Sequence, residues 1–180
     1  MNRICIIPAR GGSKRIPRKN IKLFLGKPII SYSIKAAIDS KLFDEVMVST
    51  EDQEIMSISE NLGASIPFKR SEKLSDDFTS TFDVLNDVLN RYSKNGKNYD
   101  YACCLYPTAP FITSKILEEA FDLMLKNSYD SVFPIIEYGH PIQRAIRLNN
   151  KKIEYVSSEN INKRFNIKIL NTFLNFKPDL

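Results

Sequence analysis

The sequence predicts a single α/β domain with a mostly parallel sheet, helices on both faces of that sheet and a β-hairpin arm near the C-terminus. The chain has 180 residues, which is enough for one domain with a hydrophobic core. Short apolar runs alternate with segments of helical periodicity, and this alternation is typical of parallel sheets covered by helices. Polar segments follow several of the apolar runs, and open α/β sheets bind ligands at that edge.

The first half of the chain supplies the start of this pattern. In chain order we expect a strand at residues 4–8, a helix at 29–40, a strand at 46–49, a helix at 52–62 and a short third strand at 66–68. Asp52 is placed to begin the second helix, and Gly63 is placed to end it.

The second half continues the alternation and ends in the arm. In chain order we expect a helix at residues 80–92, a strand at 101–105, a helix that Thr113 caps, a strand at 131–136 and a hairpin formed by 145–148 and 153–156. The run at 101–105 is apolar throughout, which is typical of a central strand. Gly96 ends the first of these helices.

The most distinctive segment directly follows the first expected strand and combines two adjacent glycines with many cations. Gly11 and Gly12 lack a Cβ, so their backbone can adopt positive φ or approach a ligand closely, and successive N–H groups then form an anion-binding concavity. The surrounding cations are Arg10, Lys14, Arg15, Arg18 and Lys19. The spacing is neither that of a Walker loop nor that of a dinucleotide-binding loop. The segment predicts one ligand with several phosphates; the alternative is a solvated basic loop.

The charge distribution separates a small ligand from a nucleic acid. Residues 1–35 hold nine Lys and Arg and no acid, whereas residues 36–150 hold 11 Lys and Arg against 18 Asp and Glu. A nucleic-acid binder usually carries a basic stripe over one face. The localised patch therefore favours a small polyphosphate, and we expect no nucleic-acid partner.

Composition also indicates the cellular compartment in which we expect the protein. No apolar stretch is long enough to span a membrane, and the first residues lack the features of a signal peptide. Cys5, Cys103 and Cys104 cannot all pair within one chain, and their spacing is not that of metal ligands. We expect buried free thiols in a reducing cytoplasm.

The glycine and cation segment, residues 6–20, closely resembles the N-terminal signature of the CMP-sialic acid synthetase family, whose members activate nonulosonic acid sugars with CTP. The resemblance covers roughly residues 3–164, and its further matching segments are 26–30, 49–52, 70–71 and 106–110. Within the family, residues 75–81 and 141–145 look most like members that act on pseudaminic acid.

The resemblance implies a Rossmann-like nucleotidyltransferase fold and a defined reaction. The anomeric hydroxyl of a nine-carbon keto sugar acid attacks the α-phosphate of CTP, which yields a CMP-sugar and pyrophosphate. Such transfer depends mostly on positioning and on neutralising phosphate charge. The resemblance also implies a divalent ion, Mg²⁺ or another divalent cation, on the phosphate oxygens, and a homodimer formed through the arm.

The resemblance assigns a role to each candidate site residue. The nucleotide-binding residues are Ala9, Arg10, Gly11, Gly12, Ser13, Lys14, Asn20, Arg70 and Thr81. The catalytic residues are Arg10, Lys19 and Asn20, of which the two cations stabilise negative charge in the transition state and Asn20 contacts the nucleotide phosphate. The sugar acid is assigned to Tyr106, Gln143 and Arg144, because Arg can hold a carboxylate with two hydrogen bonds.

Several of these residues also have a plainly structural interpretation. Arg70 can form a surface ion pair with Glu72, and Thr79, Ser80 or Thr81 can simply cap the helix that follows. Gln143 and Arg144 can belong to the hairpin edge. For the remaining polar residues near the motifs, we expect Arg18 and Lys22 to be solvated cations and His140 to be a loop residue, and we leave Arg15 unassigned.

The sequence departs from the family pattern after Arg164. The resemblance implies an aspartate-glycine-glutamine-aromatic motif there, with an aspartate that helps to bind the metal, and residues 165–180 do not contain it. We expect a cytidylyltransferase domain at 1–164 that is incomplete at its C-terminal end, followed by a divergent tail at 165–180, and we assign no metal ligands. A shifted reading frame is one hypothesis for the tail. The functional hypotheses are a pseudaminic acid cytidylyltransferase, an enzyme for another sialic-like acid, and a truncated, inactive nucleotide-binding protein.

Overall fold

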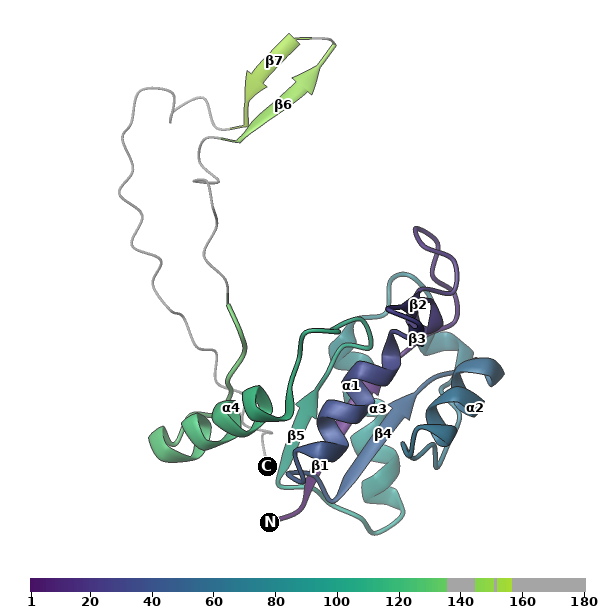
Figure 1. The fold of residues 1–180 in the computed structure, drawn as a ribbon, viewed down its shortest axis with the longest axis vertical. Coiled ribbons are helices and arrows are strands. Elements are labelled where there is room, and N and C mark those ends of the chain that lie inside the picture. The colour runs from purple at the N-terminus through teal and green to yellow at the C-terminus, as the bar shows by residue number, and fades with distance from the viewer. Residues whose placement is uncertain (136–144, 151, 157–180) are drawn as a thin grey trace. The chain divides into compact units, whose positions relative to one another are not determined.

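The computed structural model describes residues 1–135, 145–150 and 152–156 (Figure 1). The chain divides into two compact units, residues 1–122 and 123–180, and each is described by itself. The expected domain boundary at residue 164 and the sugar-acid residues Gln143 and Arg144 lie outside the described residues.

The first unit is built on a parallel sheet. β1 (Arg3–Pro8) lies between β4 (Glu45–Ser49) and β5 (Tyr101–Cys104), and both neighbours run parallel to it. The register places Cys5 opposite Val46 on one side and opposite Cys103 on the other. All three strands were expected, and the parallel arrangement brings their carboxyl ends to one edge.

Helices cover both faces of the sheet because the side chains of β1 alternate between two apolar layers. Cys5 and Ile7 belong to a layer that includes Ile30 and Ile34 of α1 (Ile30–Asp39) and Ile55 of α2 (Gln53–Asn61). Ile4 and Ile6 belong to the opposite layer, with Val88 and Tyr92 of α3 (Thr81–Lys94). Every side chain from Ile4 to Ile7 is fully buried. The prediction of a parallel sheet between helices is confirmed.

The helices begin and end where the local chemistry predicts. The carboxylate of Asp52 accepts hydrogen bonds from the N–H groups of Glu54 and Ile55, both at 3.0 Å, and so caps α2. Thr113 Oγ1 accepts from the N–H of Ile116 at 3.3 Å at the start of α4 (Ser114–Asn127). The glycines expected to end α2 and α3, Gly63 and Gly96, both have positive φ.

Several short elements were not predicted. Between β1 and α1, a 3-10 turn, η1 (Lys19–Ile21), is followed by a hairpin of two strands of two residues each, β2 (Leu23–Phe24) and β3 (Lys27–Pro28). A second 3-10 turn, η2 (Glu72–Leu74), precedes α3. Elements of two or three residues carry too little periodicity for a sequence pattern to detect them.

Two expected strands are wrong within the described residues. Residues 66–68 form no strand, and the pairing in this region is a single bridge between Met47 and Ser65. Pro67 has no N–H to donate to a ladder, which limits pairing beyond that bridge. Residues 131–135 are also irregular, and residue 136 lies outside the described part. Their apolar character indicated a strand, but no described segment pairs with them.

The environment of the cysteines is only partly as expected. All three are free thiols, and Cys5 is buried, but Cys104 is exposed. The register pairs Cys104 with Ile6, so it lies on the α3 face of the sheet. β5 forms an edge of the described sheet instead of its centre, and its alternate residues Ala102 and Cys104 remain uncovered.

The second unit contains the expected hairpin. β6 (Ile146–Asn149) and β7 (Lys152–Tyr155) are antiparallel, with Ile146 opposite Tyr155, and Asn150 supplies a positive φ at the turn. Among the described helices, none has the combination of length and apolar character that crossing a membrane requires.

Candidate functional site

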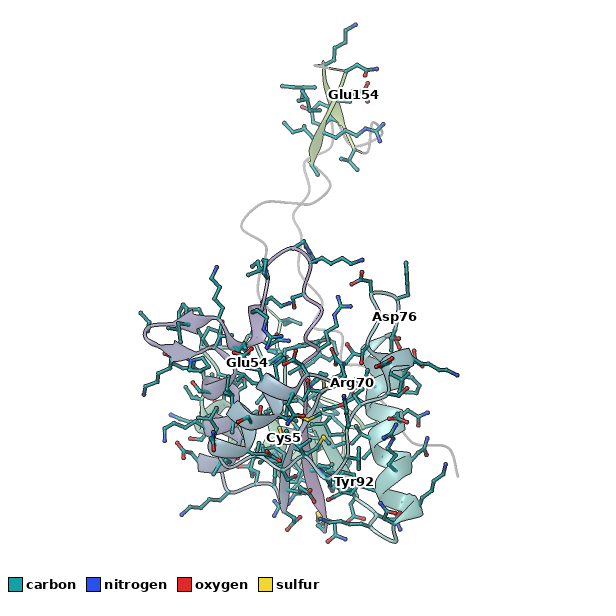
Figure 2. The ribbon with its side chains drawn as sticks, turned by 90° about the vertical axis from the view of Figure 1, so that its right-hand side faces the viewer. Cys5, Glu54, Arg70, Asp76, Tyr92 and Glu154 are labelled. Atoms are coloured by element: carbon teal, nitrogen blue, oxygen red, sulfur yellow. The ribbon has the colours of Figure 1, made fainter. Side chains whose placement is uncertain are left out.

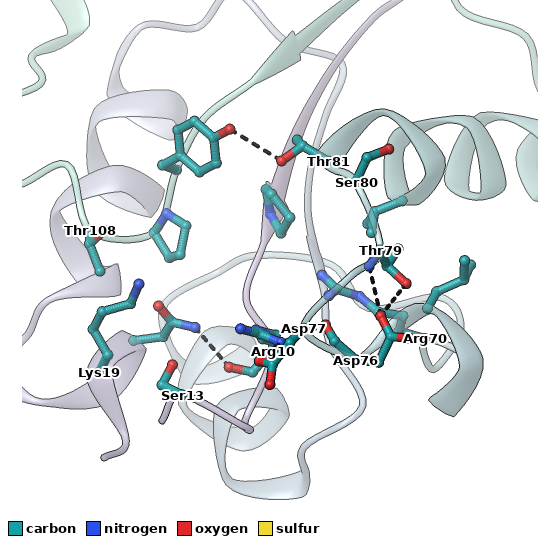
Figure 3. A pocket seen from close by; sticks show the side chains of 16 residues that line it. Arg10, Ser13, Lys19, Arg70, Asp76, Asp77, Thr79, Ser80, Thr81 and Thr108 are labelled. Carbon is teal, nitrogen blue, oxygen red and sulfur yellow. Dashed lines mark hydrogen bonds and ion pairs between the residues drawn. The ribbon is translucent and has the colours of Figure 1, made fainter. Parts of the chain in front are cut away.

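A polar pocket lies at the carboxyl ends of β1 and β5 (Figure 3), where the strand order predicts a ligand site. The residues that line it come from four segments of the first unit: Pro8 at the end of β1 with Arg10, Ser13, Lys19 and Asn20 after it; Arg70, Leu74, Asp76, Asp77, Thr79 and Ser80 before α3; Thr81 and Val84 in α3; and Tyr106, Pro107 and Thr108 after β5.

The pocket brings together most of the predicted site residues that the structure describes. Those that line it are Arg10, Ser13, Lys19, Asn20, Arg70, Thr81 and Tyr106. Ala9 is fully buried beside them, and Gly11, Gly12 and Lys14 belong to the same loop without lining the pocket. Residues separated by up to about a hundred positions in the sequence thus converge because the strand ends converge.

Gly11 lies so close to the segment that begins α2 that no larger residue fits there without a shift. Its N–H donates to Glu51 Oε1 at 2.7 Å, and a Cβ built on it would lie 2.5 Å from Asp52 Oδ2. Neither Gly11 nor Gly12 has positive φ, and a Cβ on Gly12 would meet no atom within 4 Å. Gly11 therefore lets the chain pass close to the Asp52 cap of α2. The expected positive φ is found at neither glycine, and the expected close approach to a ligand stays a prediction.

Arg10 and Lys14 face a loop that precedes α3. Arg10 Nη1 lies 2.7 Å from Asp77 Oδ1 and donates to the backbone oxygen of Asp76 at 2.5 Å. Lys14 Nζ forms an ion pair with the other oxygen of Asp77. Hydrogen bonds from Lys14 and Arg10 lower the pKa of the Asp77 carboxyl. Both cations therefore have a carboxylate partner at the mouth of the pocket.

Arg70 is a buried cation, so the alternative interpretation of Arg70 as a surface ion pair with Glu72 is wrong. Its side chain is buried (5% exposed for the residue), and its guanidinium donates to Ser49 Oγ at 3.0 Å and to the Ser49 backbone oxygen. Burial lowers the pKa of Arg70, while the nearby charge of Glu51 opposes that shift. Figure 2 shows Arg70 below the loop that carries Asp76. A charge held in this way presents a fixed positive potential to the pocket.

The side chain of Asn20 holds the backbone at the start of the glycine loop, the segment of residues 9–20 that follows β1. It is buried, and its Nδ2 donates to the backbone oxygen of Arg10 at 2.8 Å. Its Oδ1 is buried without a hydrogen-bond partner. Such an unpaired acceptor is unfavourable unless a donor reaches it. Asn20 thus fixes the backbone from which the Arg10 side chain extends.

The far side of the pocket joins α3 to the segment after β5. Thr81 Oγ1 and Tyr106 Oη lie 3.2 Å apart, as Figure 3 shows. Ser80, and not Thr81, caps α3, because Ser80 Oγ accepts from the N–H of Asp83 at 3.1 Å and Asp83 completes a capping box. Thr79 is bound to Asp76 instead, at 2.7 Å. The Thr81 hydroxyl is thereby left to face the pocket.

Arg18 is not a freely solvated cation, contrary to the expectation. Its guanidinium forms a two-pronged ion pair with Asp52, at 2.5 Å and 2.9 Å, and a further ion pair with Glu54. Hydrogen bonds from Arg18 are the main reason that the pKa of Asp52 falls to about 2. The ion pairs of Arg18 therefore connect the glycine loop to the first turn of α2.

The other polar residues near the motifs lie outside this contact. Lys22 and Arg15 are exposed, and His140 lies outside the described residues.

Sequence reasoning missed the acidic residues of the pocket, Asp76 and Asp77. The local signal was an aspartate three residues before Thr79, which is typical of a turn in which the carboxylate accepts local N–H groups. The carboxylate of Asp76 does accept from the N–H groups of Phe78 and Thr79, at 3.0 Å and 2.7 Å. Nothing local could show that Asp77 would meet cations more than sixty residues upstream.

The described residues do not by themselves fit a metal held by the protein. Across residues 1–135 and the described hairpin, no group of three or more His, Cys, Asp or Glu side chains is arranged to hold a metal ion. Both oxygens of Asp77 already face cations, and Asp76 is engaged with Thr79.

A parallel sheet between two helical layers, with a cationic pocket at the carboxyl ends of its strands, is the arrangement of Rossmann-like nucleotidyltransferases. The chain belongs to the cytidylyltransferase family, whose model matches residues 4–172. The resemblance read from the sequence is thus confirmed at the level of the family.

Individual relatives agree with this assignment. The pseudaminic acid cytidylyltransferase of Campylobacter jejuni subsp. jejuni serotype O:2 is 46% identical over 159 residues, which are 88% of this chain and 68% of the relative. The CMP-N,N'-diacetyllegionaminic acid synthase of Legionella pneumophila subsp. pneumophila is 36% identical over 137 residues, which are 75% of this chain and 59% of that protein.

A solved structure shares the fold. The CMP:2-keto-3-deoxy-manno-octonic acid synthetase complexed with CTP superimposes with a TM-score of 0.59 at 25% identity, over 71% of this chain and 49% of that one. The present chain therefore spans about two thirds of the similar Campylobacter enzyme and about half of this structural neighbour.

Proposed function

We propose that this chain transfers CMP from CTP to a nonulosonic acid, that the acceptor is pseudaminic acid, and that pyrophosphate is released. The observation that carries the proposal is the convergence of Arg10, Lys19 and Arg70 in one pocket of a cytidylyltransferase fold. The choice of acceptor is supported by two pseudaminic acid cytidylyltransferases of Campylobacter jejuni strains, 46% and 44% identical to this chain.

In this proposal the loop after β1 holds the triphosphate. Arg10, Ser13 and Lys14 supply side-chain donors, and Ala9, Gly11 and Gly12 form the backbone beside them. The N–H groups of Ala9 and Gly11 donate to Ser49 and Glu51 within the protein, so the Gly12 N–H is the backbone donor proposed for the phosphates. Asn20 keeps the Arg10 backbone in place through its 2.8 Å hydrogen bond. Its amide N–H is the group that can donate to a phosphate oxygen, whereas its unpaired oxygen can accept only from a donor such as a ribose hydroxyl. These groups position the α-phosphate for attack.

The opposite wall of the pocket receives the nucleoside and the sugar acid. Arg70 provides a buried positive charge toward the cytosine acceptors, and Thr81 contacts the base or the ribose. Tyr106, which lies 3.2 Å from Thr81, faces the sugar acid. Gln143 and Arg144 are proposed to hold the acceptor and its carboxylate.

The reaction is a displacement at phosphorus. The oxygen of the anomeric hydroxyl forms a bond to the α-phosphorus, and the hydroxyl proton passes to solvent water. The bond between the α-phosphorus and the oxygen that bridges the α- and β-phosphates breaks, and pyrophosphate leaves with that oxygen. Arg10 and Lys19 neutralise the charge that builds up on the phosphate oxygens and on the leaving pyrophosphate. Removal of one such contact typically raises the activation barrier by about 3 kcal/mol, which lowers the rate about 10²-fold.

Three further features belong to this proposal: a requirement for Mg²⁺, a homodimer formed through the arm, and a cytoplasmic location. Mg²⁺ usually keeps several waters and binds through substrate phosphates, so it would enter with CTP. Chelation followed by Mg²⁺ return tests the first feature, and sedimentation tests the second.

Pyrophosphate release from CTP and pseudaminic acid tests the function, with N-acetylneuraminic acid, UTP and a no-sugar reaction as controls. We expect pyrophosphate release with CTP and pseudaminic acid, and turnover that is about 10²-fold slower in Arg10→Met. The rate should be unchanged in Lys22→Met, because Lys22 is exposed and does not line the pocket. Release that depends on N-acetylneuraminic acid instead would transfer the proposal to another acceptor. A folded protein that binds no CTP would refute it.

A further inference from the structure

The loop that carries Asp76 and Asp77 supplies negative charge at the place where the proposed function puts a triphosphate. Asp77 places one carboxylate oxygen 2.7 Å from Arg10 Nη1 and the other against Lys14 Nζ. The backbone oxygen of Asp76 accepts a further hydrogen bond from Arg10. One carboxylate thus occupies two of the three side chains assigned to the triphosphate.

The geometry of the loop directs Asp77 toward these cations. The Asp76 carboxylate accepts from the N–H groups of Phe78 and Thr79 and from Thr79 Oγ1, which folds the loop into a tight turn. The neighbouring Asp77 side chain is then presented to Arg10 and Lys14. Asp76 shapes the turn, whereas Asp77 makes the charge contacts.

Apolar packing contributes little at the tip of this loop. Phe78 at its tip is 93% exposed, so no apolar burial anchors it. The side chains of the two ion pairs are 29% to 82% exposed, and ion pairs at such exposure contribute little individually. A polyphosphate carries several charges on oxygens that accept from Arg and Lys in the same way as a carboxylate.

We propose that Asp77 is an internal competitor of the phosphates: it holds Arg10 and Lys14 before the nucleotide binds, leaves them when the triphosphate arrives, and returns to them as pyrophosphate departs. This inference rests on the proposed function. Asp77 thereby weakens polyphosphate binding and promotes release of the pyrophosphate product. It makes Asp77 a determinant of ligand affinity that touches the cations and not the substrate.

Calorimetric titration of Asp77→Asn with CTP, inorganic pyrophosphate and cytidine tests the proposal at fixed ionic strength. We expect CTP and pyrophosphate to bind about two- to tenfold more tightly than to the unmodified chain, which is the range for two partly exposed ion pairs. Cytidine lacks phosphate, so its affinity should not change. Equal or weaker binding of both phosphate ligands would overturn the proposal.

Asp76→Asn is the matched control, because it removes the same charge one residue away, and asparagine preserves the turn. The competitor model requires a clearly larger gain in Asp77→Asn than in Asp76→Asn. Equal gains would assign the effect to overall charge and overturn the model. Asp77→Ser provides a second variant, and thermal melting of each checks that it is folded. If the unmodified protein binds no CTP, the proposed function fails, whereas normal CTP binding without the Asp77 effect removes only this inference.

Discussion

Replacement of Glu45 by glutamine is expected to destabilise the fold in a way that depends on pH. Glu45 begins β4, at the opposite end of the sheet from the pocket, and its side chain is 12% exposed. Its carboxylate accepts hydrogen bonds from Ser65 Oγ and Tyr99 Oη, both at 2.7 Å, and from Lys97 and Tyr92. Figure 2 shows Tyr92 at this end of the first unit.

The magnitude follows from the protonation of this carboxylate. Burial alone would raise the pKa of Glu45, but hydrogen bonds, that from Lys97 foremost, outweigh burial and lower the pKa to about 2. A fall from the ordinary value of 4.5 corresponds to about 3 kcal/mol of stability at neutral pH, which solvent screening reduces to about 2 kcal/mol. The contribution is complete above pH 4.5 and is lost as the pH falls toward 2, because the folded-state pKa is the lower one.

Urea unfolding of the unmodified chain and of Glu45→Gln between pH 7 and pH 3 measures this contribution. We expect a difference of about 2 kcal/mol at pH 7 that shrinks as the pH falls below 4.5. Glu119→Gln is the matched control, since its pair with Lys115 is exposed and 3.7 Å long, and it should change stability by less than about 0.5 kcal/mol. A Glu45→Gln difference below 0.5 kcal/mol at pH 7, or one that stays constant down to pH 3, would refute the reasoning.

Two further predictions concern the glycine loop and the start of α3. Gly11→Ala should destabilise the protein by about 1–3 kcal/mol, because the new methyl group meets Asp52, which is itself held by Arg18, whereas Gly12→Ala should leave the melting temperature unchanged; equal melting of the two variants would contradict the packing argument. Ser80→Ala removes the cap of α3 and should cost about 1 kcal/mol in denaturant unfolding, and a cost near zero would mean that another group replaces the cap.

The sheet and its helices were predictable because their signals are local. The runs of β1, β4 and β5 are apolar and short, and the residues that cap α2 and α4 are chemically distinctive. The expected strand at 66–68 failed because an apolar run becomes a strand only when a neighbour pairs with it, and Pro67 cannot donate to that neighbour.

The pocket was predictable in outline because parallel strands bring their carboxyl ends to one edge. The partners of individual cations were not predictable. Arg10 and Arg18 are eight positions apart in one basic loop, yet Arg10 lines the pocket and Arg18 binds the cap of α2. That difference is set by Asp77 and Asp52, which reach the loop from other parts of the chain.

The burial of β1 on both faces limits how this protein can vary. Because Ile4 and Ile6 fill one layer and Cys5 and Ile7 fill the other, a single residue inserted within β1 would exchange the contents of the two layers. The length of β1 is therefore fixed by the core, and this determines where the strand ends, at Pro8, and where the basic loop begins. Changes that adapt the pocket to a different ligand are consequently confined to the loops, where the chain can lengthen or shorten without disturbing the core.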